Sequence, residues 1–574
     1  MTDHLKKEWY LYTKRADFQK IGERFGIEPV AARVLRNRDL ITEEQIDRFL
    51  NAGAEDLYDA AMLPDGEKSA KILSEKIRSK KKIRIVGDYD ADGVCASYVL
   101  WDALLSLGAD CSIAIPDRIR DGYGINSAIV SAAVKDGVDT IITCDNGISA
   151  CEELKAAADA GLTVIITDHH EIRKGADGKE ILPPAAGIVN VCREDSAYPE
   201  KELCGTVTAW KFVSLLFREF GRDPEEYLKY LEFAALATIC DCIDLKGENR
   251  IIAKEGLRVL SAGGVNTGMK ALIRCTGLTG KKVTCYGAGF VLGPCINAGG
   301  RMETAERAFS LFASPDAQTA SERAAYLVGL NESRKELTAK GTEAAVAVVE
   351  KEKQQKKVLV VSLRDLHESL AGIVAGRLKE YYGRPAFVFT ASDREGIWKG
   401  SGRSVEAYNM FEELAKAGDL LQKFGGHPMA AGLSVREEDI PLLEERLNTQ
   451  TALTDDDLKT KVWIDSELPF SRISEKLVGD LEKLEPFGGG NEKPRFALRN
   501  VHPANFRVMG RTRNALRMDL YAEDGIVLPG IMFGDADALK KELETRDRIS
   551  ILFYPVINEW NGYRTLNVQI EDYR

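Results

Sequence analysis

The sequence lacks an apolar run of the ~18 residues that a membrane-spanning helix requires. Its first residues also lack the apolar core of a secretory signal peptide. Both absences argue against membrane insertion and against secretion. We therefore expect a cytoplasmic protein that has no membrane partner.

Cysteine is present without the spacing of a zinc site. The chain has 11 cysteines, an odd number, and all of them fall between Cys95 and Cys295. The closest pair, Cys240 and Cys242, is separated by one residue, whereas zinc sites use pairs separated by two or more. We expect reduced and mostly buried thiols.

Acidic residues outnumber basic ones, which argues against a surface that is basic throughout. The formal net charge is −11, and 29% of the 574 residues are charged. Carboxylates gathered around metal ions would add to the acidic count, while local patches such as residues 78–84 stay basic. The net charge therefore does not exclude a nucleic-acid partner. The length exceeds the ~250–300 residues at which one core stops growing, so roughly two to four domains are expected.

The most informative stretch places three carboxylates at alternating positions after an apolar run. Residues 82–87 lead into Asp88, Asp90 and Asp92. Side chains two apart on extended chain point the same way, so these carboxylates can crowd together only if a cation offsets their repulsion. A calcium-binding loop begins with the same spacing, but it needs a glutamate at its twelfth position, where Val99 stands. A solvated acidic turn is the other alternative.

From residue 82 the pattern alternates between strands and helices, which predicts an α/β fold with a parallel sheet covered on both faces. Strands are expected at 82–86, 111–115, 140–144 and 162–167, and helices at 94–107, 126–135 and 149–160. Ligands of such sheets bind beyond the carboxyl ends of the strands. Asp145 and the run Asp168, His169 and His170 follow two of these strands, and an apolar helix at 232–239 leads to Asp241. We predict that these side chains converge on the Asp88 turn.

The run 168–170 resembles the signature of the DHH phosphoesterase superfamily, and within it the chain is similar to the RecJ family of bacterial exonucleases. Further motifs match in the expected order, at residues 203–205, 241–250, 293–301 and 425–432. The resemblance covers roughly residues 30–574. Two positions depart from the family pattern, which usually has Arg where Cys295 stands and Trp where Leu366 stands. The first departure removes a candidate phosphate contact.

The resemblance, together with the composition, implies a division of the chain into parts. A parallel-sheet DHH domain and a second α/β domain, DHHA1, are expected to be joined by a long helix and followed by an oligonucleotide-binding β-barrel. The expected parts are a helical N-terminal segment at 1–80, the DHH domain at 81–315, the connector helix at 316–352, DHHA1 at 353–455 and the barrel at 456–574. In the barrel, Phe506, Tyr521 and Phe533 are candidates for stacking on bases, with core positions as the alternative.

The resemblance also implies roles for individual residues. One divalent cation would be held by Asp88, Asp90 and Asp145, and a second by Asp92, Asp145, His169 and Asp241. Manganese is expected first and magnesium second, because carboxylates with imidazole suit them better than zinc or copper. Asp168 would orient the imidazoles, and His170 would meet the scissile phosphate, so the expected catalytic residues are His170, Asp168 and Asp145. The residues expected at the nucleic acid are Arg118, Tyr123, Asn297, Arg301, Ser401, Arg403, Gly425, Gly426 and His427.

The implied function is hydrolysis of single-stranded DNA from the 5′ end to mononucleotides, by a two-metal mechanism, in DNA repair and recombination. We expect single-stranded DNA as substrate, with RNA left open, a helicase or single-strand-binding protein as partner, and a monomer. Three alternatives stay open. These are a phosphodiesterase acting on small nucleotides, a nuclease acting on short RNA, and a non-catalytic replication factor that binds nucleic acid.

Overall fold

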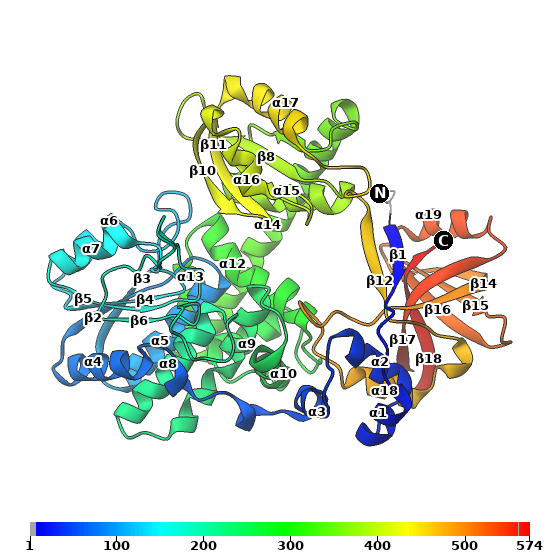
Figure 1. Cartoon of the computed structure of the whole chain (residues 1–574), viewed down its shortest axis with the longest axis horizontal. Helices are drawn as coiled ribbons and strands as arrows, with labels where there is room; N and C mark the ends of the chain where they lie inside the picture. Colours follow the sequence, from blue (N-terminus) through cyan, green and yellow to red (C-terminus); the bar gives the residue numbers. More distant parts are fainter. Residues whose placement is uncertain (1–6, 561) are drawn as a thin grey trace. The chain divides into compact units, whose positions relative to one another are not determined.

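The computed structural model describes residues 7–560 and 562–574 (Figure 1). They form two units, each described here by itself. The larger unit comprises residues 53–380 and 384–453, and the smaller unit comprises the residues up to Ala52, residues 381–383 and residues 454–574. Among the described residues, no helix combines the length and apolar character needed to cross a membrane.

The larger unit contains a parallel sheet with the strand order β3-β2-β4-β5-β6. Its strands are β2 (Lys82–Val86), β3 (Asp110–Ala114), β4 (Thr140–Cys144), β5 (Thr163–Thr167) and β6 (Gly187–Val189). One face packs against α4 (Gly66–Arg78), α5 (Ala91–Ser106) and α8 (Gly205–Glu219), and the other against α6 (Ser127–Lys135) and α7 (Cys151–Asp159). The predicted parallel sheet with helices on both faces is confirmed, and β4 is buried along its whole length.

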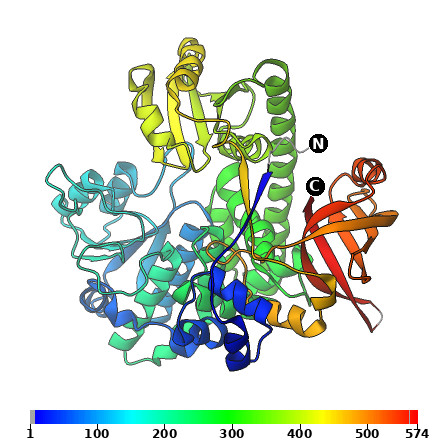
Figure 2. The same ribbon diagram turned by 45° about the vertical axis from the view of Figure 1, so that its right-hand side comes forward.

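Further helices complete the first core of the larger unit. They are α9 (Leu231–Cys240), α10 (Gly247–Ser261), α11 (Thr267–Cys275), α12 (Gly293–Met302) and α13 (Glu306–Phe312). The predicted long helix is α14 (Ala317–Glu352), whose N-cap Asp316 accepts a hydrogen bond from the Thr319 N–H. Ala320 in its first half belongs to the first core, whereas Gly341 in its second half faces Leu366. The helix therefore joins two subdomains, as Figure 2 shows for its green ribbon.

The second subdomain has the sheet order β10-β11-β9-β8-β7. Its strands are β7 (Leu359–Ser362), β8 (Ala386–Ala391), β9 (Ile397–Arg403), β10 (Leu421–His427) and β11 (Ala430–Arg436), and its helices are α15 (Ala371–Tyr382), α16 (Met410–Ala415) and α17 (Ile440–Gln450). Residues 425–427 of the last sequence motif end strand β10. The hairpin to β11 is made by residues 428–429, and His427 pairs with Ala430.

The smaller unit contains the predicted barrel. Its sheet has the order β13-β14-β15-β16-β18-β17, and β14 also pairs with β17, which closes the ring. The strands are β13 (Ser466–Glu467), β14 (Phe496–Met509), β15 (Ala515–Tyr521), β16 (Val527–Phe533), β17 (Ile549–Trp560) and β18 (Tyr563–Tyr573), and the accompanying helices are α18 (Glu475–Glu482) and α19 (Ala536–Leu543). Phe506 packs against the core, whereas Tyr521 and Phe533 are 41% and 60% exposed.

The N-terminal residues belong to the smaller unit, and the prediction that residues 1–80 are helical is wrong for part of them. Strand β1 (Lys7–Leu11) pairs in parallel with β12 (Thr460–Ile464), so backbone groups of both strands find partners. Helices α1 (Phe18–Phe25), α2 (Pro29–Asn37) and α3 (Glu43–Asn51) follow and share the core of the barrel. Residues 1–6 lie outside the described residues. The other predicted boundaries stay predictions.

A buried carboxylate fixes the N-terminal segment to the barrel. Asp465 is 2% exposed, and its Oδ1 accepts hydrogen bonds from Arg38 Nη1 at 2.9 Å and Asn37 Nδ2 at 3.0 Å. Its Oδ2 accepts one from the backbone N–H of Arg495 at 3.1 Å. Removing one partner of such a network leaves the others buried without compensation. Asp465 therefore has a structural role.

We expect the substitution Asp465→Ala to destabilise the smaller unit by about 3–5 kcal/mol, because it leaves Arg38 unpaired in a buried site. Hydrogen exchange of the β14–β18 amides in the intact protein measures this unit separately. Glu43→Ala is the matched control, because its ion pair with Arg24 at 3.2 Å is more than 60% exposed on both sides, and such pairs contribute at most about 1 kcal/mol. Equal exchange in the two variants would contradict the role assigned to Asp465.

Candidate functional site

The carboxyl ends of the strands in the larger unit bring the predicted acidic residues together. Asp88, Asp90 and Asp145 form one group, and Asp92, His169 and Asp241 form a second. Within each group the candidate ligand atoms lie within 4.8 Å of one another. The two groups adjoin, because His169 Nε2 lies 3.1 Å from Asp145 Oδ1. The residues predicted as metal ligands are thus found together at one edge of the sheet.

Asp145 occupies the centre of this arrangement in an unusual backbone conformation. Its φ of 61° lies in the left-handed region, which costs a residue with a Cβ atom of order 1–3 kcal/mol. The conformation is held by a hydrogen bond from its N–H to Thr167 O at 3.0 Å and by one that Tyr123 Oη donates to its carbonyl at 2.5 Å. Gly205 lies against it, and a Cβ atom there would come within 2.5 Å of the Asp145 Cβ. The carboxylate is therefore positioned by contacts on several sides.

Helix N-termini hold two of the other carboxylates. Asp90 caps α5 and accepts hydrogen bonds from the Asp92 and Gly93 N–H groups at 3.0 and 3.1 Å. Asp92 accepts one bond each from the N–H groups of Gly205 and Thr206, both at 2.7 Å, at the start of α8. The partial positive charge of a helix N-terminus stabilises an anion. Both carboxylates are thus fixed by backbone dipoles.

Several carboxylates of this arrangement have raised pKa values. Burial, and then the neighbouring carboxylates, raise the pKa of Asp88 and of Asp145 well above the usual range. The same causes raise the pKa of Asp241 to about 8, with Asp92 as its strongest neighbour. Without a cation, protons would have to replace the missing positive charge at neutral pH. The donor set of carboxylate oxygens and one imidazole fits a divalent cation of the manganese or magnesium type.

Asp168 lies behind the two histidines. It is 1% exposed, and its Oδ1 accepts hydrogen bonds from the His169 N–H at 2.7 Å and from His170 Nδ1 at 2.8 Å. Burial opposes the charge of His170, but this hydrogen bond and the charge of Asp168 raise the pKa of His170 to about 9. Burial lowers the pKa of His169. The pKa values of the two neighbouring imidazoles are therefore shifted in opposite directions. The shift favours the protonated form of His170 and the neutral form of His169, which can bind a metal ion.

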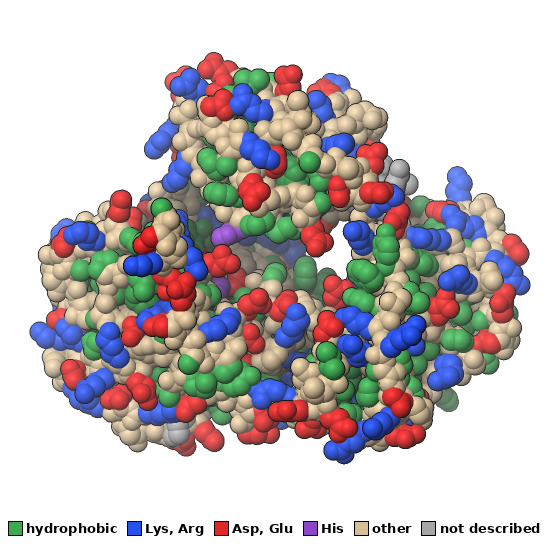
Figure 3. Space-filling model, viewed as in Figure 1, with side chains coloured by type: hydrophobic (Ala, Val, Ile, Leu, Met, Phe, Trp, Pro, Cys, Tyr) green, Lys and Arg blue, Asp and Glu red, His purple; other side chains and the backbone are tan. Residues whose placement is uncertain are grey.

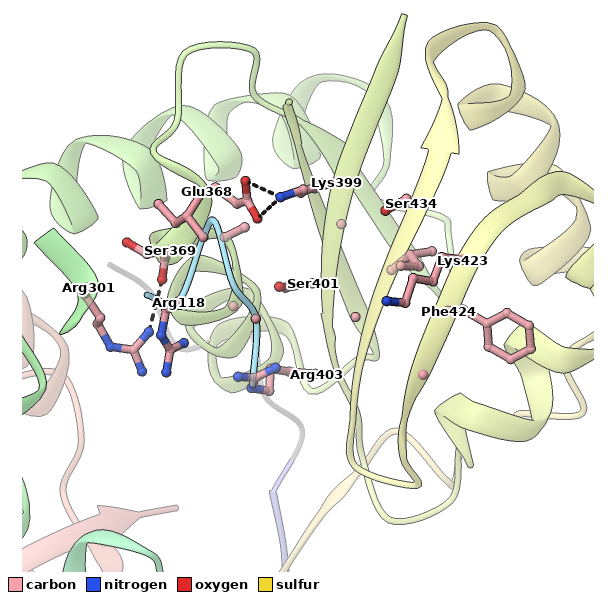
Figure 4. A pocket seen from close by; sticks show the side chains of 18 residues that line it. Arg118, Arg301, Glu368, Ser369, Lys399, Ser401, Arg403, Lys423, Phe424 and Ser434 are labelled. Carbon is pink, nitrogen blue, oxygen red and sulfur yellow. Dashed lines mark hydrogen bonds and ion pairs between the residues drawn. The ribbon is translucent and has the colours of Figure 1, made fainter. Parts of the chain in front are cut away.

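A second site, in the same unit, is a pocket of about 490 Å³ between the two subdomains. Arg118, Arg301 and Arg403 converge there, as Figure 4 shows. Arg118 lies over the Tyr89 ring at 4.1 Å, and Arg301 donates to Ser369 O at 3.0 Å.

Among the described residues, no ion pair within 4.0 Å involves any of the three guanidinium groups, although Asp90 partly offsets the charge of Arg301. Burial, followed by Arg118 and other arginines, lowers the pKa of Arg301 to about 9, and burial and Arg118 lower the pKa of Arg403. The Nε of Arg118 is buried and has no hydrogen-bond partner among the described residues. Guanidinium groups bind phosphate through paired hydrogen bonds. The pocket therefore has the chemistry of a phosphate-binding site.

The other residues predicted to contact nucleic acid lie in three places. Ser401 and Gly425 line the same pocket. Tyr123 lies at the acidic centre, with its Oη 3.2 Å from His170 Nε2, and Asn297 Oδ1 accepts a bond from the Ala91 N–H at 2.9 Å. Gly426 and His427 are exposed and are not among the residues that line the pocket.

Two lysines of the pocket were not predicted from the sequence. Lys423 points toward the pocket from β10 in Figure 4, and Lys399 pairs with Glu368 at 2.7 Å. A lysine in a strand carries no local signal of such a role. On the face in Figure 3, acidic and basic side chains are interspersed, so the positive charge of the pocket is local and agrees with a net charge of −11.

Some residues of the sequence motifs are structural. Glu248 is completely buried and accepts hydrogen bonds from Lys211 Nζ at 2.5 Å and Tyr198 Oη at 2.6 Å. Cys295 is also buried, and its Sγ accepts a bond from Asn331 Nδ2 on α14 at 3.4 Å. This cysteine therefore faces α14 and replaces a charged contact with packing. All 11 cysteines are free thiols, as predicted, but the prediction that most of them are buried is wrong, because only Cys95, Cys144, Cys204 and Cys295 are buried.

Comparisons with known proteins cover most of the chain. Models of protein families match at residues 82–238 (DHH family, N-terminal domain), 355–452 (DHHA1 domain) and 464–572 (RecJ OB domain). The single-stranded-DNA-specific exonuclease RecJ of Bacillus subtilis is 35% identical over 99% of this chain and 71% of its own length. The protein of the same name from Haemophilus influenzae is 30% identical, over 96% of this chain and 97% of its own.

Comparison with solved structures agrees with the sequence matches. RecJ of Thermus thermophilus in complex with Mn²⁺ superposes with a TM-score of 0.84 at 28% identity, covering 100% of this chain and 80% of that one. A second structure, exonuclease RecJ bound to manganese, gives a TM-score of 0.60 at 32% identity and covers 69% of this chain and 96% of that one.

Proposed function

This chain belongs to the RecJ family of single-stranded-DNA-specific exonucleases, and we propose that the acidic edge of its parallel sheet is the hydrolytic centre. The protein is an exonuclease that hydrolyses single-stranded DNA, and it carries DHH, DHHA1 and oligonucleotide-binding domains. The predicted family, fold and activity are confirmed. The observation that carries the proposal is the pair of adjoining ligand groups around Asp145.

The enzyme depends on a divalent cation, and we propose two, with manganese preferred. Asp88, Asp90 and Asp145 would hold one ion, and Asp92, Asp145, His169 and Asp241 the other. The support is the donor set and the raised pKa of Asp88, Asp145 and Asp241, which two positive ions would relieve. When bound, such ions supply an activated water and neutralise charge that develops on the phosphate.

The residues around this centre position the reacting phosphate. Asp168 accepts a hydrogen bond from His170 Nδ1, and Nε2, which lies 3.2 Å from Tyr123 Oη, would face a phosphate oxygen. Because its pKa is raised to about 9, His170 carries a positive charge at neutral pH and can stabilise a negative phosphate. Asn297 and the α5 N-terminus hold the Asp90 turn in place. Hydrolysis then proceeds without a covalent intermediate on the protein.

We propose further that the arginine pocket binds the 5′-terminal phosphate. It lies in the same unit as the acidic edge, and Arg118, Arg301 and Arg403 line it together. A strand held there by its end would be cut from the 5′ side and would release mononucleotides. The barrel would increase the affinity for the strand, and Tyr521 and Phe533 are its exposed candidates for stacking on bases.

Several expectations stay predictions. They are use of RNA, a helicase or single-strand-binding partner, a monomeric state, a cytoplasmic location and a role in repair and recombination. A phosphodiesterase for small nucleotides would have no use for the barrel, and a non-catalytic binding protein would have no use for the intact ligand groups.

The substitution Asp145→Asn tests the hydrolytic centre. It keeps the shape of the side chain but removes the charge that we propose both ions share, so manganese-dependent turnover should fall by more than the ~10–100-fold that loss of an orienting residue costs. Asp244→Asn is the control, because Asp244 follows the same helix but pairs with Lys246 at 2.7 Å and belongs to neither group. Near-normal turnover of Asp145→Asn would remove this residue from the centre.

The substitution Arg403→Ala tests the polarity. The wild-type protein should have a lower KM for a strand with a 5′ phosphate than for one with a 5′ hydroxyl. A charged hydrogen bond contributes about 1.5–3 kcal/mol, so the variant should lose ~10–100-fold of that preference. Arg377→Ala serves as control, since Arg377 is exposed and pairs with Glu380. Equal degradation of strands blocked at the 5′ end and strands with a free 5′ end would show that the assignment is wrong.

A further inference from the structure

Two aromatic side chains of the larger unit are exposed side by side. Tyr286 is 67% exposed and Phe290 is 68% exposed. Among the described residues of this unit, no other large hydrophobic side chain is as exposed. Their rings stack with centroids 5.2 Å apart and an angle of 17° between the planes. The chain thus presents a flat apolar surface to water.

The segment that carries the rings is a π-helix (Gly287–Leu292) that continues directly into α12. Helical turns of this kind are rare and occur frequently at functional sites. The segment packs closely on the end of α9. A Cβ atom at Gly289 would lie 3.3 Å from the Ile239 side chain, and one at Gly293 would lie 2.3 Å from Cys240 Sγ.

This packing places the segment that carries the aromatic pair against the end of α9, the helix that leads to Asp241. Ile239 and Cys240 directly precede Asp241, the C-cap of α9 and a candidate metal ligand. On the other side, α12 supplies Asn297 to the Asp90 turn and Arg301 to the arginine pocket. One continuous helical segment therefore connects the rings to both sites.

We propose that Tyr286 and Phe290 form a stacking platform for the bases of the single strand whose terminal phosphodiester lies in the hydrolytic centre. This inference rests on the proposed function and adds a positioning site to it. Lys281, which precedes the rings on the chain, is exposed as well.

The surroundings favour a nucleic-acid strand over a protein partner. Thr284 and Lys281, which precede the rings on the chain, are exposed and polar. A stable protein interface buries at least ~1,200 Å² in total, far more than two rings provide. A base has a flat face of the same kind as an aromatic ring, and stacking on it needs no particular sequence. That tolerance suits an enzyme that degrades strands of any sequence.

The double substitution Tyr286→Ala with Phe290→Ala tests the platform in the full-length, metal-loaded protein. On single strands of ~10 nucleotides its KM should rise at least ~10-fold, because each stacked base accounts for a ~5- to 150-fold difference in affinity. On the p-nitrophenyl ester of thymidine 5′-monophosphate, which has no second base, kcat and KM should be unchanged. Tyr286→Phe keeps the ring and should behave as the wild type. Tyr326→Ala is the matched control, since Tyr326 is 45% exposed and contacts Glu303.

Strands with abasic sites distinguish a loss of base stacking from a folding defect of the double variant. Replacing the bases beyond the first nucleotide by abasic sites should raise the KM of the wild type but not that of the double variant. If the variant matches the wild type on intact strands, the platform is refuted and these rings belong to another surface, such as a protein contact. If it loses hydrolysis of the ester as well, the rings support the centre itself and the platform is also refuted. If the wild type cleaves neither strand nor ester, the proposed function fails instead.

Discussion

Repulsion among carboxylates that lie close together with little access to water is the constraint on which the rest of the larger unit depends. Asp88, Asp90, Asp92 and Asp145 can be held together only by rigid supports and by positive charge. The supports are the ends of β2 and β4 and the N-termini of α5 and α8, whose N–H groups bond the carboxylates directly. The left-handed backbone of Asp145 is a local cost of bringing its carboxylate to the centre. Divalent cations supply the remaining charge.

The arginine pocket presents the opposite problem in the same unit. There Arg118 repels Arg301 and Arg403, and burial makes the charges of Arg301 and Arg403 more costly. In the proposed function one strand of nucleic acid would occupy both sites, with its terminal phosphate at the arginines and its first phosphodiester at the acidic edge. The two subdomains joined by α14 would then bind one substrate. The net charge of the chain does not reveal the two sites, because the acidic edge and the arginine pocket carry charges of opposite sign.

Much of the fold and of the acidic site could be predicted from the sequence, because short stretches of the chain carry the relevant patterns. The strands and helices from residue 82 onward follow from period and turn residues, and α14 follows from its composition. The convergence of Asp88, Asp145 and His169 follows from the topology of a parallel sheet, because each follows the carboxyl end of a strand. Strand β1 could not be predicted, because its partner β12 lies far along the chain and so short a strand carries no hairpin signal. Lys423 and the exposed pair Tyr286 and Phe290 were missed for a similar reason, since their surroundings are set by tertiary packing.

The most direct test of the account is the location of manganese in crystals of the protein, measured by anomalous scattering at the manganese edge. The account predicts two peaks, one among Asp88, Asp90 and Asp145 and one among Asp92, His169 and Asp241, with Asp145 touching both. A single peak, or peaks that leave Asp145 without a metal contact, would contradict the claim that this carboxylate joins two ions in one hydrolytic centre.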